Sequence, residues 1–512
     1  MKKTIFLIVM MLVVALGIGL LPRSNATAAA WQTKVDPWVM QTATTGETEF
    51  LVLLTEQADL GAAASLPTKL EKGAYVYQTL KATAARTQGP LLAELDRLGV
   101  EHQAYWVANM VWVRGDAAVV QALAQRPDVA RISANPWVHL SEVDVQPVPQ
   151  EIPTTIEWNI TKVGAPSVWA LGDTGQGTVV AGQDTGYDWD HPALINQYRG
   201  WDGANADHDY NWHDSIHTNN PNTAPGNPCG FDSVEPCDDN GHGTHTMGTM
   251  VGDDGGANQI GMAPGAEWIS CRNMEEGWGM PSTYSECFEW FIAPTDLSGN
   301  NPDPSQAPHV INNSWGCPAS EGCTDPLILQ TVVDNTRAAG IVVVVSAGNS
   351  GSGCSTVDTA AAIYDSSYSV GATTSTDAIA SFSSRGPVTI DGSNRLKPDI
   401  SAPGQSIRSS IPGGGYQGGW SGTSMAGPHV AGLVSLVISA APSLTGDVNT
   451  LEDLINETAV QLQTTQTCGG TNGQIPNNVF GYGRIDALAA YNAAILLPGS
   501  NWNYLPLILN EP

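Results

Sequence analysis

The sequence predicts a doubly wound α/β domain with a mostly parallel sheet, preceded by a small α+β domain. In the longer part of the chain, apolar runs end in Gly, Asp, Asn or Ser at residues 177–186, 266–274, 309–316 and 340–351, and residues 325–340 have a helical pattern. Buried strands that alternate with helices are typical of a parallel sheet covered on both faces. In such sheets functional residues follow the carboxyl ends of strands, where this sequence keeps its polar residues.

The small domain is predicted by the preceding part of the chain. Strand patterns occupy residues 49–54 and 109–115, helical spacing of apolar residues occupies 90–100 and 117–129, and residues 129–140 predict a closing strand. This part contains no cysteine and no cluster of catalytic residue types. The Pro-rich passage after it, VDVQPVPQEIPTT, indicates an exposed linker that a protease can cut.

Composition and charge narrow the class of protein. The 512 residues are 42% hydrophobic and 14% charged, with 54 Gly and 33 Pro, as in a folded, loop-rich protein of two or three units. The formal net charge is -29. Because non-specific nucleic-acid binding needs clustered Lys and Arg, this charge excludes it and indicates a soluble, self-repelling surface.

Residues 1–30 have the layout of a secretory signal peptide: Lys2 and Lys3 precede a long apolar run, and small residues follow at Ala26, Ala28 and Ala30. An N-terminal membrane anchor is the alternative, but the Ala-rich site favours cleavage. No later run is apolar for long enough to span a bilayer, so we expect a secreted protein with no membrane span in its mature form. The expected divisions are 1–30 leader, 31–145 small domain, 146–497 large domain and 498–512 tail.

The eight cysteines all lie in the large domain, and an even number in an exported protein indicates disulfides. Cys229 with Cys237, and Cys317 with Cys323, are close enough in sequence to pin local loops. The pairing of the other four stays open. A zinc site is a weaker reading because the sequence has no CxxC pair.

Three polar side chains in Gly-rich settings are the candidates for chemistry. Asp184 ends a buried strand, His242 opens a run of small residues, and Ser424 opens an apolar helix. A serine becomes a useful nucleophile when a base lies within hydrogen-bond reach and a third group fixes the tautomer of that base. The free N–H groups at the start of the helix also favour a developing oxyanion. Taken singly, these residues suit a turn, a core position and a helix cap, so the prediction rests on their occurring together.

The segments VVAGQDTGYDWDHP, GHGTHTMGTM and GTSMAGPHVAG resemble the Asp, His and Ser boxes of the subtilisin-like serine peptidases, in that family's chain order. The resemblance covers roughly residues 158–494, and the cysteine-bearing stretches look closest to the bacillopeptidase F-like branch. It implies a subtilisin-like fold with Asp184, His242 and Ser424 as the catalytic triad. It also implies that the small domain is a ferredoxin-like, I9-type propeptide that assists folding, covers the cleft and is cut off between about Leu140 and Thr155.

The resemblance extends to residues beyond the triad. Asn349 matches the side chain that completes the oxyanion hole with the Ser424 N–H, although an Asn between glycines also suits a tight turn. The matching substrate-binding segments are those that pair with an extended peptide and line the first specificity pocket; they contain Ser314, Trp315, Gly316 and Gly348. Trp315 taken alone suits a core position.

Metal binding is left open by the sequence. Ala193 stands where many relatives carry a calcium-ligating Asp, so the usual strong site is in doubt, while Asp253 and Asp254 leave room for a modified one. The acidic stretch at 202–214 matches no standard calcium loop and indicates a solvated surface. The resemblance implies that His245 and His429 are structural.

These observations predict a secreted, monomeric serine endopeptidase made as a zymogen. Its partners are polypeptide substrates and its own propeptide, and catalysis needs no cofactor. The alternatives are a catalytically silent binding or scaffold protein on the same fold, and a lipase or esterase. The latter expects Ser in a GxSxG turn, whereas Ser424 lies in GTSMA.

Overall fold

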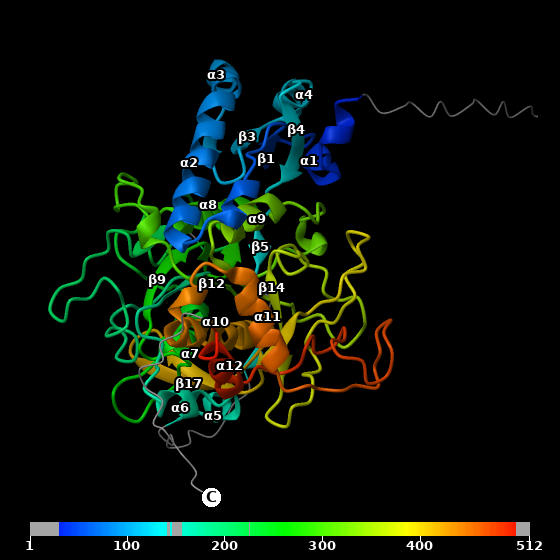
Figure 1. The fold of residues 1–512 in the computed structure, drawn as a ribbon. Coiled ribbons are helices and arrows are strands. Elements are labelled where there is room, and N and C mark those ends of the chain that lie inside the picture. Colours follow the sequence, from blue (N-terminus) through cyan, green and yellow to red (C-terminus); the bar gives the residue numbers. More distant parts are fainter. Residues whose placement is uncertain (1–29, 141–143, 146–155, 225, 498–512) are drawn as a thin grey trace, which may run out of the picture.

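The chain forms a small unit that is docked on a large unit (Figure 1). The computed structural model describes residues 30–140, 144–145, 156–224 and 226–497. Nearly all of the predicted leader, most of the linker and the tail at 498–512 lie outside these residues. In Figure 1 the small unit is the blue and cyan part, beside helices α8 (Pro281–Ile292) and α9 (Gln330–Ala338) of the large unit.

The small unit is built on an antiparallel sheet with the strand order β2-β3-β1-β4. With its helices it follows the β-α-β-β-α-β succession of ferredoxin-like folds, as predicted. Alternate residues of the central strand point to opposite faces, so Phe50 and Val52 pack in the unit's own core while Leu51 packs with α8 and α9. The elements are β1 (Thr48–Leu54), β2 (His102–Tyr105), β3 (Met110–Gly115), β4 (Val129–Ala134), α1 (Pro37–Thr42), α2 (Lys69–Thr87), α3 (Gly89–Leu98) and α4 (Ala117–Ala124).

Three of these elements, α1, α2 and β2, were not predicted from the sequence. Helix α2 begins with a capping box, in which the Thr68 side chain accepts from the Glu71 N–H and the Glu71 carboxylate accepts from the Thr68 N–H. It buries Val76 and Leu80 one turn apart, but Gly73 on the same face weakens the apolar pattern. Strand β2 is short and only partly buried, so it lacks the alternation that marks a strand.

The large unit contains a seven-stranded sheet with the order β15-β14-β13-β12-β7-β9-β8, and every strand pair in it is parallel. This confirms the predicted doubly wound α/β class. The strands are β7 (Val179–Asp184), β8 (Trp212–Asp214), β9 (Glu267–Arg272), β12 (Val310–Asn313), β13 (Val342–Ser346), β14 (Tyr368–Thr373) and β15 (Ile400–Pro403).

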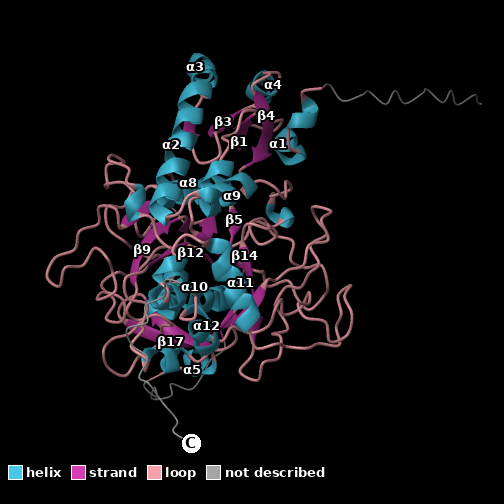
Figure 2. Ribbon diagram, in the orientation of Figure 1, coloured by secondary structure: helices cyan, strands magenta, loops and turns pink. Residues whose placement is uncertain are grey.

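Helices cover both faces of this sheet, as Figure 2 shows. In β13, Val342 and Val344 pack with α7 (His242–Val251) and α10 (Thr423–Ala440), whereas Val343 and Val345 pack with α8 and α9. This two-sided burial is why the strand is apolar at every position. Among the described helices, α10 alone is long and apolar enough to cross a membrane, and 94% of it is buried within the fold, as in a core helix. The helices not yet given are α5 (Trp158–Lys162), α6 (Ala165–Trp169), α11 (Val448–Thr458) and α12 (Ala487–Ala494).

The predicted closing strand of the small unit is divided in two. Residues beyond β4 leave the small sheet and form β5 (Val138–His139), which pairs antiparallel with β11 (Trp278–Gly279) of the large unit, next to β10 (Met274–Glu275). Further along, β6 (Asp144–Val145) pairs with β17 (Gly415–Ser421), which also pairs with β16 (Ile407–Ile411). The end of the small unit therefore adds strands to two edges of the large unit.

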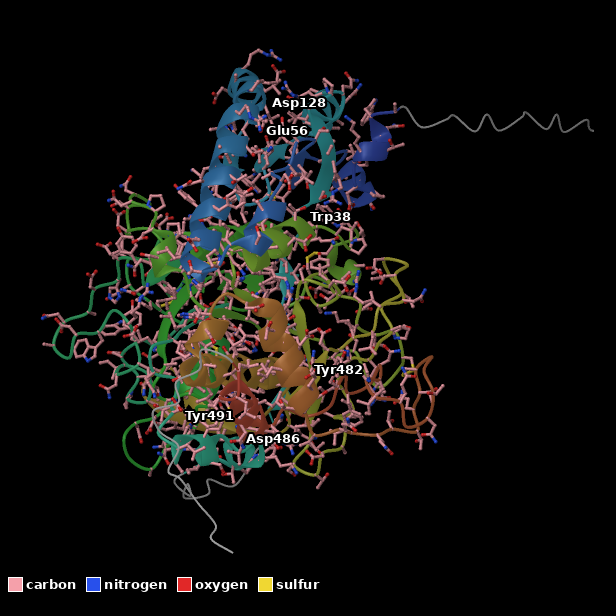
Figure 3. All side chains as sticks on the ribbon, in the orientation of Figure 1. Trp38, Glu56, Asp128, Tyr482, Asp486 and Tyr491 are labelled. Carbon is pink, nitrogen blue, oxygen red and sulfur yellow. A yellow bond between two sulfur atoms is a disulfide. The ribbon has the colours of Figure 1, made fainter. Side chains whose placement is uncertain are left out.

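Side-chain contacts reinforce this docking. The Glu289 carboxylate on α8 accepts hydrogen bonds from the backbone N–H groups of Trp106 (2.5 Å) and Val107 (2.8 Å) in the turn between β2 and β3. At another edge of the contact, Thr324 Oγ1 donates to both Asp36 oxygens at 2.7 and 2.8 Å. Trp38, labelled in Figure 3, marks this junction.

All eight cysteines are paired. The two local bridges that the sequence favoured, Cys229–Cys237 and Cys317–Cys323, are present. The four cysteines whose pairing the sequence left open form Cys271–Cys287, which joins β9 to α8, and Cys354–Cys468, which joins two loops 114 residues apart.

Candidate active site

The strand order brings polar residues from distant parts of the sequence to one edge of the sheet. Strands β7, β12 and β13 are neighbours, and each ends at or just before a candidate residue: Asp184, Ser314 and Asn349 respectively. Because the strands are parallel, their carboxyl ends lie at the same edge. Helix α10 begins with Thr423 there, and Ser424 is its second residue.

His242 is the first residue of α7 and is paired with Asp184. Its Nδ1 lies 2.8 Å from Asp184 Oδ1 and 2.9 Å from Oδ2, and both side chains are almost fully buried. The backbone N–H of Thr185 donates to the same carboxylate at 2.7 Å. The start of the helix can approach this closely because residue 243 is a glycine: a Cβ there would lie 2.1 Å from the carbonyl oxygen of Gly186.

Asp238, which the sequence analysis did not single out, holds the start of α7. Its Oδ2 accepts from the N–H (3.0 Å) and the hydroxyl (2.6 Å) of Thr244, and its Oδ1 accepts from the Gly241 N–H (2.8 Å) and the Thr185 hydroxyl (2.9 Å). It therefore satisfies N–H groups that the first turn leaves without helical partners. A carboxylate four residues before His242 was the available signal, since acidic groups favour helix N-termini.

Ser424 has a different partner from the one expected. Its Oγ donates to the carbonyl oxygen of Ser314 at 3.1 Å, and the Nε2 of His242 is buried with no hydrogen-bond partner among the described residues. The expected hydrogen bond between Asp184 and His242 is thus present, whereas the expected hydrogen bond between Ser424 and His242 is not formed. In unliganded enzymes such links are often long and tighten only when substrate binds.

Asn349 follows β13 and is anchored through its oxygen. Its Oδ1 accepts from the N–H and the hydroxyl of Thr423, both at 2.9 Å. These two bonds fix the orientation of the amide, and its Nδ2 group is available to donate a hydrogen bond. Asn349 and Ser424 line the same cavity, so this donor is placed beside the candidate nucleophile.

The cavity beside Ser424 has a volume of about 220 Å³. All four predicted substrate-binding residues line it, namely Ser314, Trp315, Gly316 and Gly348. The indole of Trp315 stacks on Tyr284 with 3.9 Å between ring centres and is buried in the core, as the alternative interpretation of this residue expected. Two acidic residues that the sequence analysis did not select, Glu321 and Asp358, and two residues of the docked small unit, His139 and Leu140, line the cavity as well.

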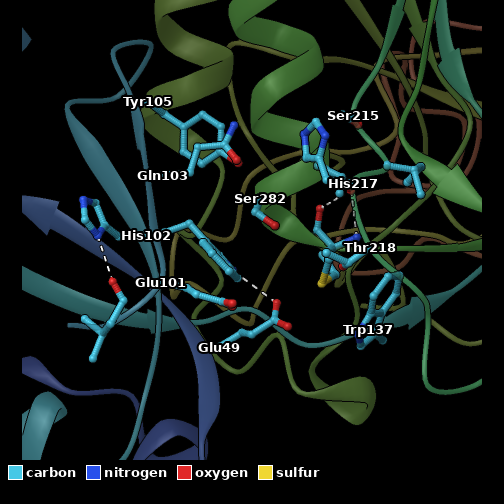
Figure 4. A pocket seen from close by; sticks show the side chains of 15 residues that line it. Glu49, Glu101, His102, Gln103, Tyr105, Trp137, Ser215, His217, Thr218 and Ser282 are labelled. Atoms are coloured by element: carbon cyan, nitrogen blue, oxygen red, sulfur yellow. Dashed lines mark hydrogen bonds between the residues drawn. The ribbon is translucent and has the colours of Figure 1, made fainter. Parts of the chain in front are cut away.

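A larger cavity, of about 450 Å³, lies between the two units (Figure 4). Its walls include Glu49, His102 and Trp137 of the small unit and His217 and Ser282 of the large unit. No predicted site residue is among the described residues that line it. Because the small unit supplies about half of its walls, this cavity depends on docking.

The two further histidines of the motifs have structural surroundings. His245 is buried and stacks on Trp420 with 4.4 Å between ring centres, and burial lowers its pKa to about 3. His429 is buried in α10, where its ring nitrogens contact Met425 O and Asn159 Nδ2, each at 2.8 Å, and burial lowers its pKa to about 4. Both imidazoles are therefore neutral at ordinary pH.

Within the described residues, no group of three or more His, Cys, Asp or Glu side chains could hold a metal ion. The acidic side chains of the 202–214 stretch bond to nearby groups instead: Asp202 accepts from the N–H of Ala204, and Asp214 pairs with Arg272 at 2.8 Å. Asp254 accepts from the N–H and the side chain of Asn258.

Comparison with known proteins gives a match over most of the large unit. The sequence profile of the subtilase family (Peptidase_S8) matches residues 175–483. Bacillopeptidase F of Bacillus subtilis is 37% identical over 445 residues, which are 83% of this chain and 29% of that protein. Subtilisin E of Bacillus subtilis is 31% identical over 75% of this chain and 84% of its own length, and a subtilisin of Bacillus pumilus is 33% identical over 60% of this chain and 93% of its own length.

Proposed function

The chain belongs to the subtilase family of serine endopeptidases, on the bacillopeptidase F-like branch, and we propose that it is a secreted endopeptidase made as a zymogen. Its substrates in this proposal are polypeptides, and its catalytic residues are Asp184, His242, Ser424 and Asn349. The main support is the buried Asp184–His242 pair. The other imidazole nitrogen, His242 Nε2, has no hydrogen-bond partner among the described residues, and His242 lies at the same edge of the sheet as Ser424.

Catalysis begins when the Ser424 side chain turns from the Ser314 carbonyl towards His242 Nε2. The Ser424 Oγ–carbon bond forms as its proton passes to Nε2, and Asp184 stabilises the resulting imidazolium. The oxyanion accepts hydrogen bonds from the Asn349 amide and the Ser424 backbone N–H. The carbon–nitrogen bond then breaks as His242 returns the proton to the leaving amine, and water releases the acyl group by the same steps.

The small unit acts as an inhibitory propeptide in this proposal. Its end enters the candidate active site as an added strand, and the Leu140 N–H donates to the Gly277 carbonyl at 2.7 Å. Four residues later, Asp144 pairs with Ser421, three residues before Ser424. Residues 141–143, between these two positions, lie outside the described residues. We propose that the processing cut falls among them, at the start of the range that the sequence predicts.

Secretion is supported by the disulfides, since such bonds form and persist in oxidising compartments. The leader at 1–30 would direct export and be removed, and the mature enzyme would be a monomer. No cofactor takes part in the proposed chemistry.

Expression of the full chain in a secreting host tests the proposal. Wild type should degrade casein and yield a mature N-terminus between residues 141 and 144, whereas Ser424→Ala should stay uncut and inactive. Equal casein degradation by the two proteins would reject the catalytic role of Ser424, and inactivity of both would favour a binding or scaffold protein. Ester hydrolysis without peptide hydrolysis would favour an esterase.

A further inference from the structure

The cavity beside Ser424 contains two carboxylates that the catalytic proposal does not use, those of Asp358 and Glu321. Neither Lys nor Arg is among the described residues that line the cavity. Its electrostatic field is therefore negative, which favours a positively charged group in the substrate.

The walls of the cavity are shaped for a long, unbranched side chain. Two of them are glycines that cannot be replaced without a clash or strain: a Cβ on Gly316 would lie 2.6 Å from Thr359 Oγ1, and Gly348 has a φ of +101°. Bare backbone on both sides leaves a slot between peptide groups. At about 220 Å³ the cavity is smaller than the roughly 300–1,000 Å³ clefts that hold drug-sized ligands, so it suits a single side chain.

The two loops that carry the carboxylates are fixed to one another. The Cys317–Cys323 bridge closes the loop that contains Glu321. Thr359, the neighbour of Asp358, accepts a hydrogen bond through its Oγ1 from the Cys317 N–H at 2.5 Å. The carboxylates are therefore held in place before a substrate arrives, which lowers the entropic cost of binding.

The two carboxylates differ in how they are occupied. Glu321 Oε2 accepts from the backbone N–H of His139, at 3.0 Å, so it holds the main chain of the docked segment. In the part of the chain that the structure describes, no other residue donates a hydrogen bond to the Asp358 side chain or forms an ion pair with it. By contrast, Asp365 in the same region pairs with Arg395 at 2.6 Å. Asp358 is thus the carboxylate available to a substrate side chain.

We propose that Asp358 makes this enzyme select lysine or arginine immediately before the scissile bond, while Glu321 holds the substrate backbone. The inference rests on the proposed peptidase function and names the substrate class of the same site. The processing cut proposed above does not follow a basic residue, because residues 140–155 contain no Lys or Arg. That cut is intramolecular, and the high effective concentration of the tethered segment offsets its weaker fit at the residue before the bond. The ammonium or guanidinium group would bind the Asp358 carboxylate, with the aliphatic stem between Gly316 and Gly348.

The test uses the full chain, secreted and processed, with peptides that differ only at the residue before the cut. Wild type should have a kcat/KM for Lys or Arg at least about tenfold above that for Leu or Phe, and Asp358→Asn should lose about tenfold on the basic peptides with less than twofold change on Leu. Asp358→Glu should keep the preference. Asp365→Asn is the matched control, because it removes a nearby carboxylate outside the cavity and should change neither value.

The outcomes separate this inference from the function it rests on. Cleavage of Leu and Phe peptides as fast as basic ones, or an unchanged preference in Asp358→Asn, would overturn the inference and leave the peptidase intact. Failure of wild type to cut any of the peptides would overturn the proposed function and the inference with it.

Discussion

Nδ1 of His242 lies within 2.9 Å of both Asp184 oxygens, and the two side chains are buried together where a strand end meets a helix start. A buried imidazole that is held at one nitrogen has a fixed tautomer, with its proton on Nδ1 and a lone pair on Nε2. Because Nε2 has no partner among the described residues, that lone pair can accept the proton of an incoming nucleophile.

Replacing Asp184 by Asn should change the tautomer of His242 with little change in the shape of the site. The Asn amide can donate to Nδ1, which would move the ring proton to Nε2 and leave His242 unable to act as a base. We expect kcat to fall by about 10³–10⁴ with KM nearly unchanged. Steady-state kinetics on a chromogenic peptide would check this, with Ser424→Ala giving the background rate. A fall of less than tenfold would contradict the role of Asp184.

Asn349→Leu should test the proposed role of the Asn349 amide in binding the oxyanion. Leu keeps the approximate volume but has no N–H to offer an oxyanion, so kcat should fall by about 10²–10³ with little effect on KM. The substitution also removes the acceptor for Thr423, so thermal unfolding should be measured alongside the kinetics. Loss of activity that only parallels loss of folded protein would argue against an oxyanion role.

Glu289 should control how the small unit is docked. Its carboxylate accepts from the Trp106 and Val107 N–H groups, and truncation to Ala would leave both donors without a partner. In a Ser424→Ala background, Glu289→Ala should speed hydrogen exchange of these two amides by about tenfold or more. Glu289→Gln, which keeps an acceptor, should have a smaller effect. Glu457→Ala, at an exposed position of α11, is the control, and equal exchange in all variants would contradict this account.

His245 and His429 should each contribute a loss of stability as the pH falls below neutral, because both are buried and neutral in the folded state. Burial lowers the pKa of His245 to about 3 and that of His429 to about 4, against about 6.5 in the unfolded chain. The unfolded state therefore binds more protons, and stability present above pH 6.5 is lost as the pH falls towards the folded values. At pH 5, which is 1.5 units lower, each contributes about 2 kcal/mol of loss.

Thermal unfolding of the Ser424→Ala chain between pH 7.5 and 5 would measure this slope without self-digestion. His245→Asn should flatten the slope whatever its effect on stability at pH 7.5. A slope identical to that of the parent would show that His245 does not titrate on unfolding.

The sequence predicted most of the large unit because its strands are buried on both faces. Asp184 follows an apolar run and Asn349 follows Val342–Ser346, so both positions at the strand ends could be read from hydrophobicity alone. The start of the Ser424 helix was placed to within one residue. Helix α2 was not predicted because Gly73 interrupts its apolar face, and that face packs with residues of the large unit, which no local pattern reveals.

The remaining features of the site depend on contacts between distant residues. Glu321 and Asp358 lie in segments without a recognisable motif, and the disulfide Cys317–Cys323 and the Thr359 hydrogen bond help to place them at the cavity. The present partner of Ser424, the Ser314 carbonyl, is set by a side-chain rotation that sequence patterns do not determine. The pairing of Cys354 with Cys468 spans 114 residues and depends on the final fold.

The most direct measurement of the central claim is the reaction of the processed enzyme with a fluorophosphonate probe, followed by peptide mass spectrometry. Attack of a serine oxygen on phosphorus expels fluoride and leaves a stable adduct that identifies the activated hydroxyl. We predict one adduct, on Ser424. In His242→Ala, processed by added wild-type enzyme so that the small unit does not cover the site, the rate should be at least about a thousandfold lower because the base is missing. An adduct on another serine, or equal labelling of Ser424 without His242, would contradict the account.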